Sequence, residues 1–345
     1  MPGRDPAPRW LSGLALALLV SIIFAIGLGP VFVAPEEVVR IVGHHLVGWP
    51  ATQTWPVSSN AIIWEVRTPR VLLGAVVGAT LGVCGMTLQA LTRNPLAEPY
   101  ILGVSAGAST GAAAAILFGL GAALGGLSTS MVAFLGALGA MLLVMLIAQT
   151  RGVVTPGRLL VAGVAVGYLL SSITSLLILF ADSAQSAQAV VFWLLGSLAR
   201  AEWATLPVVS LMFVAAFSLM LLWRRRLDLL ALGDESARAL GVDPGRTRTT
   251  LVVAVALCVG AAVAVSGGIG FVGLAIPHMA RRFVGVTHAL GVPAAAMLGA
   301  VVLVWADVAA RLLLQPREMP IGVVTGLIGA PVLVVLVRRL QSIEG

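Results

Sequence analysis

The chain contains no lysine, and all 21 of its basic residues are arginine. The lack of an amine excludes two kinds of chemistry, because a P-loop needs a lysine on the nucleotide phosphates and a Schiff-base enzyme needs an amine nucleophile. Any ATP hydrolysis must therefore come from a partner chain. Cysteine is almost as scarce, and Cys84 and Cys258 both lie in apolar runs, where a thiol behaves as a small buried hydrophobe. They predict neither a disulfide framework nor a metal site.

Charge is also scarce: charged residues make up 10% of the 345-residue chain, against about 25% in soluble domains, whereas 59% of the residues are hydrophobic. Runs of about 20 apolar residues recur along the chain, which is the length that a helix needs to cross a hydrocarbon core of roughly 30 Å. No long hydrophilic stretch is left for a separate soluble domain. These features predict an all-α polytopic membrane protein, with residues 1–345 forming a single transmembrane domain.

The apolar runs predict about ten transmembrane helices in one bundle. The first run lacks an A-x-A-like cleavage site, so we expect a span there and not a signal peptide. The eighth run is short for a crossing, and a half-helix or a re-entrant segment is the alternative. The predicted spans are Trp10–Pro30, Val71–Leu91, Tyr100–Gly119, Leu127–Ala148, Leu159–Phe180, Trp203–Trp223, Thr250–Ser266, Phe271–Met279, Val292–Leu314 and Ile321–Val337.

The distribution of arginine predicts the orientation, because short cytoplasmic loops are enriched in basic residues. With the N-terminus inside and ten crossings, fifteen arginines fall inside and six outside. Without the eighth crossing, Arg338 and Arg339 would move outside and the bias would shrink, so we count that segment as crossing. Both termini are then cytoplasmic. The inner arginines are Arg4, Arg9, Arg93, Arg151, Arg158, Arg224, Arg225, Arg226, Arg238, Arg246, Arg248, Arg281, Arg282, Arg338 and Arg339, and the outer ones are Arg40, Arg67, Arg70, Arg200, Arg311 and Arg317.

Glycine and proline mark close packing and two breaks. Gly74, Gly78 and Gly82 share one helix face, as do Gly322 and Gly326, and this spacing lets helices approach closely. The stretches 266–270 and 94–99 should interrupt regular helix, which is tolerated at membrane depth only inside protein or beside a water-filled cavity. Because each break follows a glycine-rich helix, the chain shows a weak internal repeat of the kind common in transporters.

The longest predicted cytoplasmic loop, residues 227–248, contains its own short helix. Asp234 is a good N-cap and Gly241 is a good C′ residue, with Ala237 and Leu240 on one face between them. An isolated helix this short is marginal in water, so we expect it to pack against a cytoplasmic partner. A helix lying on the membrane surface is the alternative.

Ordered motifs continue from Ile62 to the end of the chain. They are Arg67–Arg70 (RTPR), Gln89–Leu91 (QAL), Arg93–Pro99 (RNPLAEP), Leu102–Ala108 (LGVSAGA), Trp193–Ser197 (WLLGS), Leu232–Gly241 (LGDESARALG), Gly270–Leu274 (GFVGL), Ile276–His278 (IPH), Pro320–Gly326 (PIGVVTG) and Gly329–Pro331 (GAP). In these motifs and their order, the chain resembles the iron-siderophore, haem and vitamin B12 permease family of ATP-binding-cassette (ABC) importers.

The resemblance implies the permease subunit of an importer in the bacterial cytoplasmic (inner) membrane. The expected partners are a second copy of the chain, two cytoplasmic ATPase subunits that bind ATP and magnesium, and an external substrate-binding protein. The chain itself should bind no cofactor. The resemblance also assigns the loop helix as the element that couples to the ATPase. Its residues are Leu232, Gly233, Asp234, Glu235, Ala237, Arg238, Leu240 and Gly241.

Three further sites follow from the resemblance. Arg67, Arg70 and Arg311 match outward arginines that hold glutamates of the binding protein, although Arg311 could instead pair with Asp307 at i,i+4. A cytoplasmic gate falls at Thr155, Pro156 and Gly157, where proline and glycine replace the family's small hydroxyls next to the arginine. The pathway would be lined by the fifth and tenth spans, at Tyr168, Ser171, Ser172, Ser175 and Thr325, unless these hydroxyls bond to their own helix carbonyls.

Other functions have less support. His278 is expected to bond to a carbonyl and not to ligate haem, because no histidine spacing suggests a metal site. Asp307 is the clearest intramembrane carboxylate, whereas a proton-coupled secondary transporter would need several. An intramembrane enzyme would need a paired nucleophile and base, and the dispersed arginines do not form a nucleic-acid patch. The sequence favours a ferric chelate, either haem or a siderophore, as cargo, with cobalamin as the alternative.

Overall fold

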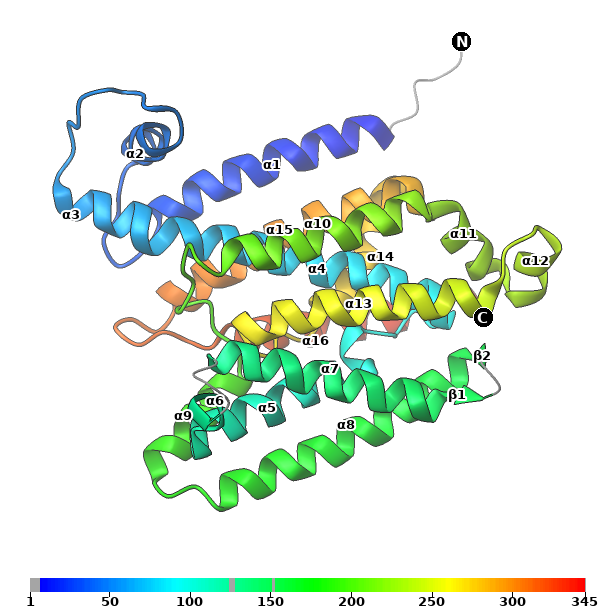
Figure 1. Cartoon of the computed structure of the whole chain (residues 1–345). Helices are drawn as coiled ribbons and strands as arrows, with labels where there is room; N and C mark the ends of the chain where they lie inside the picture. The colour runs from blue at the N-terminus through cyan, green and yellow to red at the C-terminus, as the bar shows by residue number, and fades with distance from the viewer. Residues whose placement is uncertain (1–6, 124–127, 151–152, 345) are drawn as a thin grey trace, which may run out of the picture.

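The computed structural model describes residues 7–123, 128–150 and 153–344, and in this part of the chain the long helices run along one common direction (Figure 1). Six helical segments among the described residues are long and apolar enough to cross a membrane. They are α1 (Ala7–Gly27), the continuous run of α3 (Val57–Asn60), η1 (Ala61–Arg67) and α4 (Thr68–Thr92), then α7 (Thr129–Ala148), α8 (Pro156–Leu179), α13 (Pro244–Ser266) and α15 (His288–Leu312).

Four shorter or broken segments bring the total to the ten predicted crossings. They are α5 (Val104–Phe118), α10 (Leu206–Leu222) with α11 (Arg224–Leu232), which bends away by 62°, α14 (Val272–Val284) and α16 (Ile321–Glu344). Of the predicted residues, Arg4, Leu127 and Arg151 lie outside the described part. The remaining elements connect the spans: α2 (Pro35–Val47), η2 (Pro99–Leu102), α6 (Leu120–Ala123), α9 (Ala184–Leu194), α12 (Asp234–Ala239) and the paired strands β1 (Gln149–Thr150) and β2 (Val153–Val154).

The short eighth segment traverses the bundle as a broken span. Ser197 N donates to Ser266 O at 2.8 Å, which places the end of α13 beside the end of α9. His288 N donates to Asp228 Oδ1 at 3.0 Å, which places the start of α15 beside α11, at the opposite end (Figure 1). The chain between them therefore crosses, first as irregular backbone at 267–271 and then as α14, whose 13 residues span about 20 Å.

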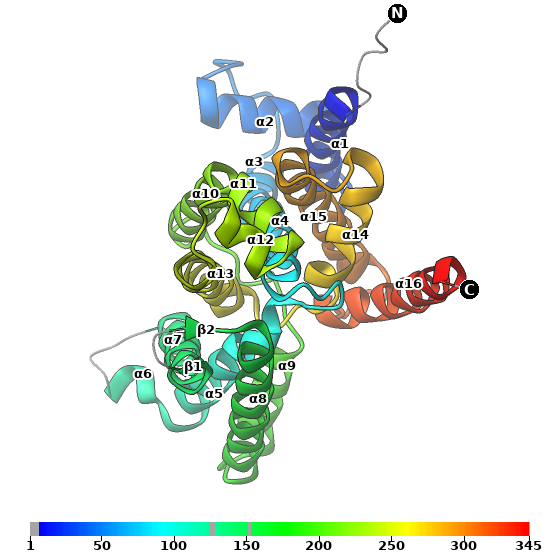
Figure 2. The ribbon, with the colours of Figure 1, turned by 90° about the vertical axis from the view of Figure 1, so that its right-hand side faces the viewer.

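The two ends of the bundle are named here after the predicted orientation. We call the end that holds Arg70 and Glu318 the outer end, and the end that holds Asp234 and Arg248 the inner end; an ion pair joins each of these two pairs. Viewed from the inner end, α4 lies in the interior, while α8 and α16 lie at the edge (Figure 2). α4 therefore forms the centre around which the other helices pack.

Close packing against α4 depends on glycine. A Cβ added to Gly78 would strike the carbonyl oxygen of Gly299 in α15, and one added to Gly82 would strike that of Ala295. The predicted packing role is confirmed for these two glycines, whereas Gly74 faces only the Leu198 side chain.

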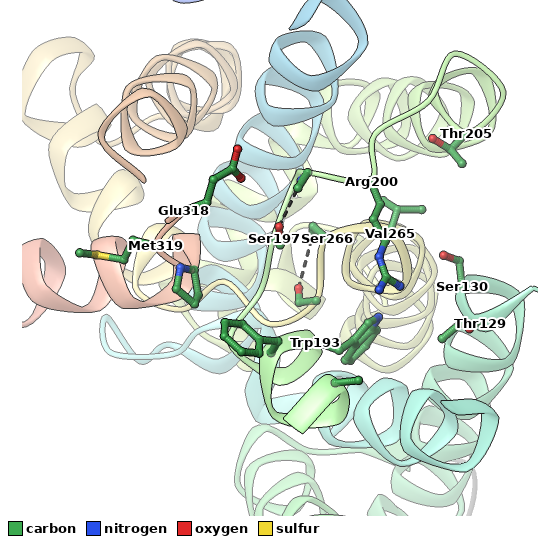
Figure 3. A pocket seen from close by; sticks show the side chains of 15 residues that line it. Thr129, Ser130, Trp193, Ser197, Arg200, Thr205, Val265, Ser266, Glu318 and Met319 are labelled. Carbon is green, nitrogen blue, oxygen red and sulfur yellow. Dashed lines mark hydrogen bonds between the residues drawn. The ribbon is translucent and has the colours of Figure 1, made fainter. Parts of the chain in front are cut away.

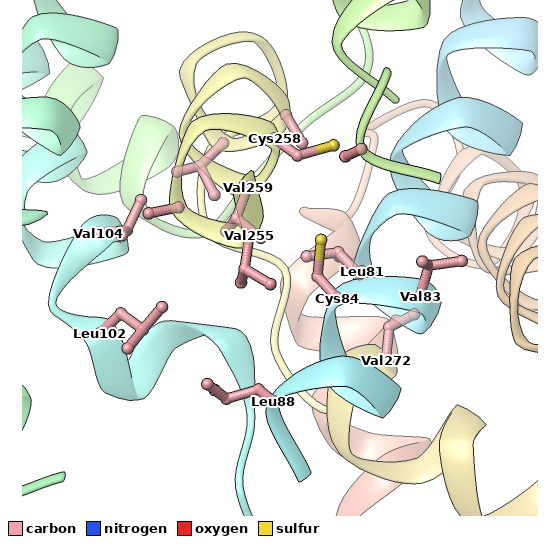
Figure 4. Close-up of a cluster of buried hydrophobic side chains, with 14 of the residues drawn as sticks. Leu81, Val83, Cys84, Leu88, Leu102, Val104, Val255, Cys258, Val259 and Val272 are labelled. Atoms are coloured by element: carbon pink, nitrogen blue, oxygen red, sulfur yellow. The ribbon is translucent and has the colours of Figure 1, made fainter. Parts of the chain in front are cut away.

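The cysteines belong to this same core. Cys84 of α4 and Cys258 of α13 are free and buried. Their neighbours include Leu81, Val255 and Val259 (Figure 4). Their surroundings confirm the prediction that they act as small buried hydrophobes.

The two helix breaks meet beside α4. The Tyr100 hydroxyl donates to Ile269 O at 3.0 Å and accepts from Ile269 N at 2.8 Å. From α4, the Gln89 amide donates to Ala97 O and Leu274 O, at 3.3 Å each. The break at 266–270 is buried or half-buried, which is one of the two settings in which irregular backbone is tolerated in a membrane. In the break at 94–99, Ala97 and Pro99 are buried, whereas Pro95 and Leu96 are exposed.

We expect Gly78→Ala to destabilise the protein by about 1–3 kcal/mol, because the new methyl group overpacks the contact between α4 and α15. The measurement is thermal unfolding of the detergent-solubilised protein. Gly139→Ala in α7 is the matched control, since a Cβ there meets no atom within 4 Å. Equal unfolding temperatures for the two variants would contradict the packing role of Gly78.

Candidate functional site

The loop helix α12 forms at the inner end with the predicted C-terminal cap. Gly241 has φ +80, its N–H bonds to Arg238 O at 3.0 Å, and Val242 N bonds to Ala237 O at 2.9 Å. This pair of bonds is the Schellman arrangement, which requires a left-handed residue at C′. The prediction for Gly241 is confirmed.

Asp234 was predicted as the N-cap of this helix, and that prediction is wrong. Gly233 occupies the cap position, and Asp234 is the first helical residue. Its carboxylate instead accepts from Arg248, with Oδ1 2.8 Å from Nη2 and Oδ2 3.3 Å from Nη1, and lies 3.9 Å from Arg93 Nη2. Burial alone would raise the pKa of Asp234, but the bond and the charge of Arg248, with Arg93 and Arg238 beyond it, hold the pKa below its ordinary value. The group is therefore ionised at neutral pH.

The exposed side chains of α12 and of the residues next to it are partly apolar and partly charged. Ala237 is fully buried, whereas Leu240 is 63% exposed and Leu232 is 70% exposed. The expected apolar face of Ala237 and Leu240 is therefore divided, with only Ala237 packed against the chain. Glu235 and Arg238 are exposed beside the two leucines. Residues 232–240, which comprise the last residue of α11, the helix α12 and its C-cap, thus expose two large apolar side chains and two opposite charges at the inner end.

The predicted gate residues begin α8, next to α12. Thr155 occupies the N-cap of α8 without a side-chain capping bond, Pro156 is the first helical residue, and Gly157 is exposed. The preceding strands pair Gln149 with Val154, a small hairpin that the sequence analysis did not predict. These residues thus lie at the inner end, where a cytoplasmic gate would have to lie.

Four of the five predicted pathway residues form a stripe on α8. Tyr168 is 74% exposed, and Ser171, Ser172 and Ser175 follow it on the same exposed face. Ser175 Oγ donates to Ser171 O at 3.0 Å, which is the bond within one helix that was considered as an alternative. Thr325 is the exception: it is 5% exposed and its hydroxyl bonds to Gly322 O, so it points into the bundle and not toward an open surface.

The three outer arginines are buried and already have partners. Arg67 is 6% exposed and donates to the carbonyls of Ile26, Gly27 and Val31, where α1 ends. It thereby takes up carbonyl oxygens that the end of a helix leaves without partners.

Arg311 and Arg70 share one carboxylate. Asp307 lies 2.9 Å from Arg70 Nε and 3.0 Å from Arg311 Nε, which confirms the i,i+4 pair considered for Arg311. Arg311 also donates to the carbonyls of Leu28 and Ala25. Arg70 reaches the surface through Glu318, whose carboxylate it binds with two bonds of 2.9 Å and whose side chain is 46% exposed. Glu318 was not predicted as a partner of Arg70, because the two residues are 248 positions apart and no motif connects them.

His278 has the role expected of it. Its Nε2 lies 2.9 Å from Pro95 O, in the first helix break. The histidine therefore ties α14 to the segment that follows α4. Among the described residues, no group of three or more potential metal ligands is present.

A cavity of about 460 Å³ opens between the outer ends of several helices (Figure 3). Its wall combines the aromatic side chains Phe192 and Trp193 with one cation, Arg200, and with the hydroxyls of Ser130 and Thr205. Glu318 also lines the cavity, so the wall carries both signs of charge beside its aromatic residues and can contact an aromatic group. None of these residues was predicted as a site from the sequence, because they come from separate parts of the chain: α7, α9, the connection between α9 and α10 and, for Glu318, the connection between α15 and α16.

Comparisons with known proteins agree with this architecture. Residues 17–339 match the model of the FecCD transport family. The chain is 38% identical over 332 residues to the vitamin B12 import system permease protein BtuC of Klebsiella pneumoniae, covering 96% of this chain and 94% of that protein. It is 40% identical over 291 residues to the hemin transport system permease protein HmuU of Yersinia pestis, covering 83% and 86%. A solved structure, described as a metal-chelate type ABC transporter in an inward-facing conformation, superposes with a TM-score of 0.83 at 33% identity, covering 96% and 99%.

We expect Asp307→Ala to cost about 3–5 kcal/mol, because it leaves Arg70 and Arg311 buried without their shared carboxylate. The measurement is thermal unfolding of the solubilised protein, together with its abundance in the membrane. Asp182→Ala, at an exposed position, is the control and should unfold like the parent. If the Asp307 variant did so as well, the outer charge cluster would not stabilise the fold.

Proposed function

The chain belongs to the FecCD transport family, and from this membership we propose that it is the transmembrane subunit of an ABC importer that works as a homodimer with two cytoplasmic ATPase subunits. Alternating access at the interface between the two copies would move the cargo inward. The chain would have no enzymatic role of its own, since it lacks the lysine of a P-loop. ATP and magnesium would bind to the ATPase subunits.

The exposed hydroxyl stripe on α8 is the observation that supports a pathway between two copies. A tyrosine and three serines along one face would meet hydrocarbon if this helix faced lipid, and polar groups are costly there. A second copy across a water-filled pathway removes this cost. The hydroxyls of Tyr168, Ser171, Ser172 and Ser175 would then line the pathway, with α16 contributing its exposed Leu327 and Ile328 in place of Thr325.

The exposed side chains of residues 232–240 are the evidence for the proposal that an ATPase subunit docks at the inner end. Leu232 and Leu240 would fill an apolar depression on the ATPase, while Glu235 and Arg238 would pair with charges at its rim. Interfaces commonly have this form, with an apolar centre and a polar rim. Gly233 and Gly241 allow the sharp turns that present the helix, and Thr155, Pro156 and Gly157 would form the gate beside it.

Docking of a substrate-binding protein is proposed at Arg70 alone. Arg67 and Arg311 are engaged with carbonyls that end α1, so using them would disrupt the fold locally. Arg70 instead exchanges one partly exposed partner, Glu318, for a carboxylate of the docking protein. A bidentate arginine and carboxylate pair can be remade in this way with little change in geometry.

The proposed cargo is a ferric chelate, either haem or a ferric siderophore, and cobalamin is the second candidate. The hemin permease of Yersinia pestis supports the first and the vitamin B12 permease of Klebsiella pneumoniae supports the second, at 40% and 38% identity. The outer cavity, with its aromatic residues and Arg200, would receive the cargo from the binding protein.

A strain that lacks this chain should fail to grow on one cargo only. We would supply haem, several ferric siderophores as sole iron source, and cobalamin under a cobalamin requirement, and then measure uptake by the reconstituted complex. Uptake should require both the ATPase and ATP. Uptake without any ATPase subunit would instead identify an ion-coupled secondary transporter, and growth on every source would direct the search to other cargo.

Replacing Glu235 and Arg238 together with alanine should uncouple ATP hydrolysis from uptake, because the contacts that carry motion from the ATPase are lost. We expect the amount of cargo taken up per ATP hydrolysed to fall by roughly tenfold. Arg246→Ala is the control, since that side chain is exposed and its ion pair among the described residues is with Asp243, the N-cap of the same helix, 3.6 Å away. Unchanged coupling in the double variant would refute the role of α12.

A further inference from the structure

Arg248 is a fully buried arginine at the inner end. It lies near the start of α13, is 1% exposed, and is one of the largest buried side chains in the described part of the chain. Arginine is almost never buried to this degree unless it is paired. The role of Arg248 can therefore be inferred from its hydrogen-bond partners.

The guanidinium of Arg248 joins three separate elements. It holds Asp234 of α12 with two bonds, of 2.8 and 3.3 Å. Nη1 also donates to Val154 O at 3.0 Å, directly before the N-cap of α8, and Nε donates to Leu91 O at 3.3 Å, in the last turn of α4. The side chain thus contacts the candidate coupling helix, the residue directly before the candidate gate, and the central helix at once.

We propose that Arg248 transmits the movement of α12 to the start of α8, and so couples the ATPase to the gate. This inference rests on the proposed function, because it requires α12 to be the docking element. A planar guanidinium fixes the direction as well as the length of each bond, so a displaced Asp234 carries the Val154 carbonyl with it. Leu91, on the packed helix α4, provides the fixed point against which the other two contacts move.

The alternative is that Arg248 is a static tie, by which we mean a residue that only stabilises the packing of the inner end and transmits no movement. The two roles differ in what they predict for a conservative substitution. Arg248→Lys keeps the charge opposite Asp234 but lacks the planar fork, so it cannot hold all three partners in one geometry. A static tie would lose stability with coupling unchanged, whereas a transmission residue would lose coupling in a complex that still assembles.

We would reconstitute the full complex, permease with its ATPase and binding protein, and measure ATP hydrolysis and cargo uptake together. Arg248→Lys should hydrolyse ATP while uptake per ATP falls by roughly tenfold. Arg246→Lys is the matched control, because it lies two residues away on the same helix with its side chain 92% exposed. It should couple like the parent.

A second measurement follows the gate directly. A spin label on Gly157→Cys, where an added Cβ meets no atom within 4 Å, reports the distance between the two copies, and the two native cysteines are buried away from the reagent. In the parent this distance should change when ATP binds. In the Arg248→Lys background the change should be lost although the ATPase remains bound.

The outcomes separate this inference from the proposed function. A parent complex whose uptake does not depend on ATP would overturn the proposed function itself. A coupled parent with an Arg248→Lys variant that also couples and moves its gate would overturn the transmission role alone. Asp234→Asn breaks the same link from the side of α12. If both variants failed to assemble, Arg248 would be a static tie and the proposal would be wrong.

Discussion

The constraint on which the structure depends is that every backbone polar group within a membrane must find its partner inside the protein. Regular helices meet it without help, but this chain interrupts its helices at 94–99 and 266–270. At both interruptions, side chains beside α4 supply hydrogen bonds to the backbone. Tyr100 bonds to both polar groups of Ile269, and Gln89 bonds to carbonyls from both sides. Small residues on α4 let α14 and α15 approach closely enough for these bonds to form.

At the two ends of the bundle, buried arginines donate hydrogen bonds to backbone carbonyls that would otherwise lack partners. At the outer end, Arg67 and Arg311 take up carbonyls that the end of α1 leaves free, and Asp307 pairs with Arg311. At the inner end, Arg248 does the same for Leu91 and Val154, with Asp234 as its counter-ion. Each end therefore combines hydrogen-bond satisfaction with charge pairing. The difference between them is that the inner pair includes a residue of the exposed helix α12.

This arrangement suggests that the core around α4 is rigid and that the edge helix α8 is the part that moves. The core around α4 is fixed by backbone contacts between glycines and small residues, which leave little freedom for sliding. The edge helix α8, by contrast, exposes most of its length and joins the core through a short hairpin and Thr155. An element with few buried contacts is the natural one to move. In the proposed mechanism, α8 responds to the ATPase, while the core and the outer arginine cluster keep the fold intact.

The sequence by itself determined the membrane class and a helical bundle of about ten spans, because apolar length is a local quantity that needs no folded structure. The orientation, which rests on the arginine bias, stays a prediction. The sequence also determined the position of α12 and the cap at Gly241, since a left-handed turn has its own residue preference.

Only the tertiary structure decided which polar groups meet. The sequence analysis assigned Asp234 to a cap, whereas the fold brings Arg248 to it from fourteen residues away and Arg93 from an earlier span. Thr325 lies on the buried side of α16, the outer arginines point inward, and Glu318 reaches Arg70 across 248 residues of chain. The physical reason is that a guanidinium or carboxylate takes the partner that packing places within about 3 Å, and sequence spacing does not specify packing between distant helices.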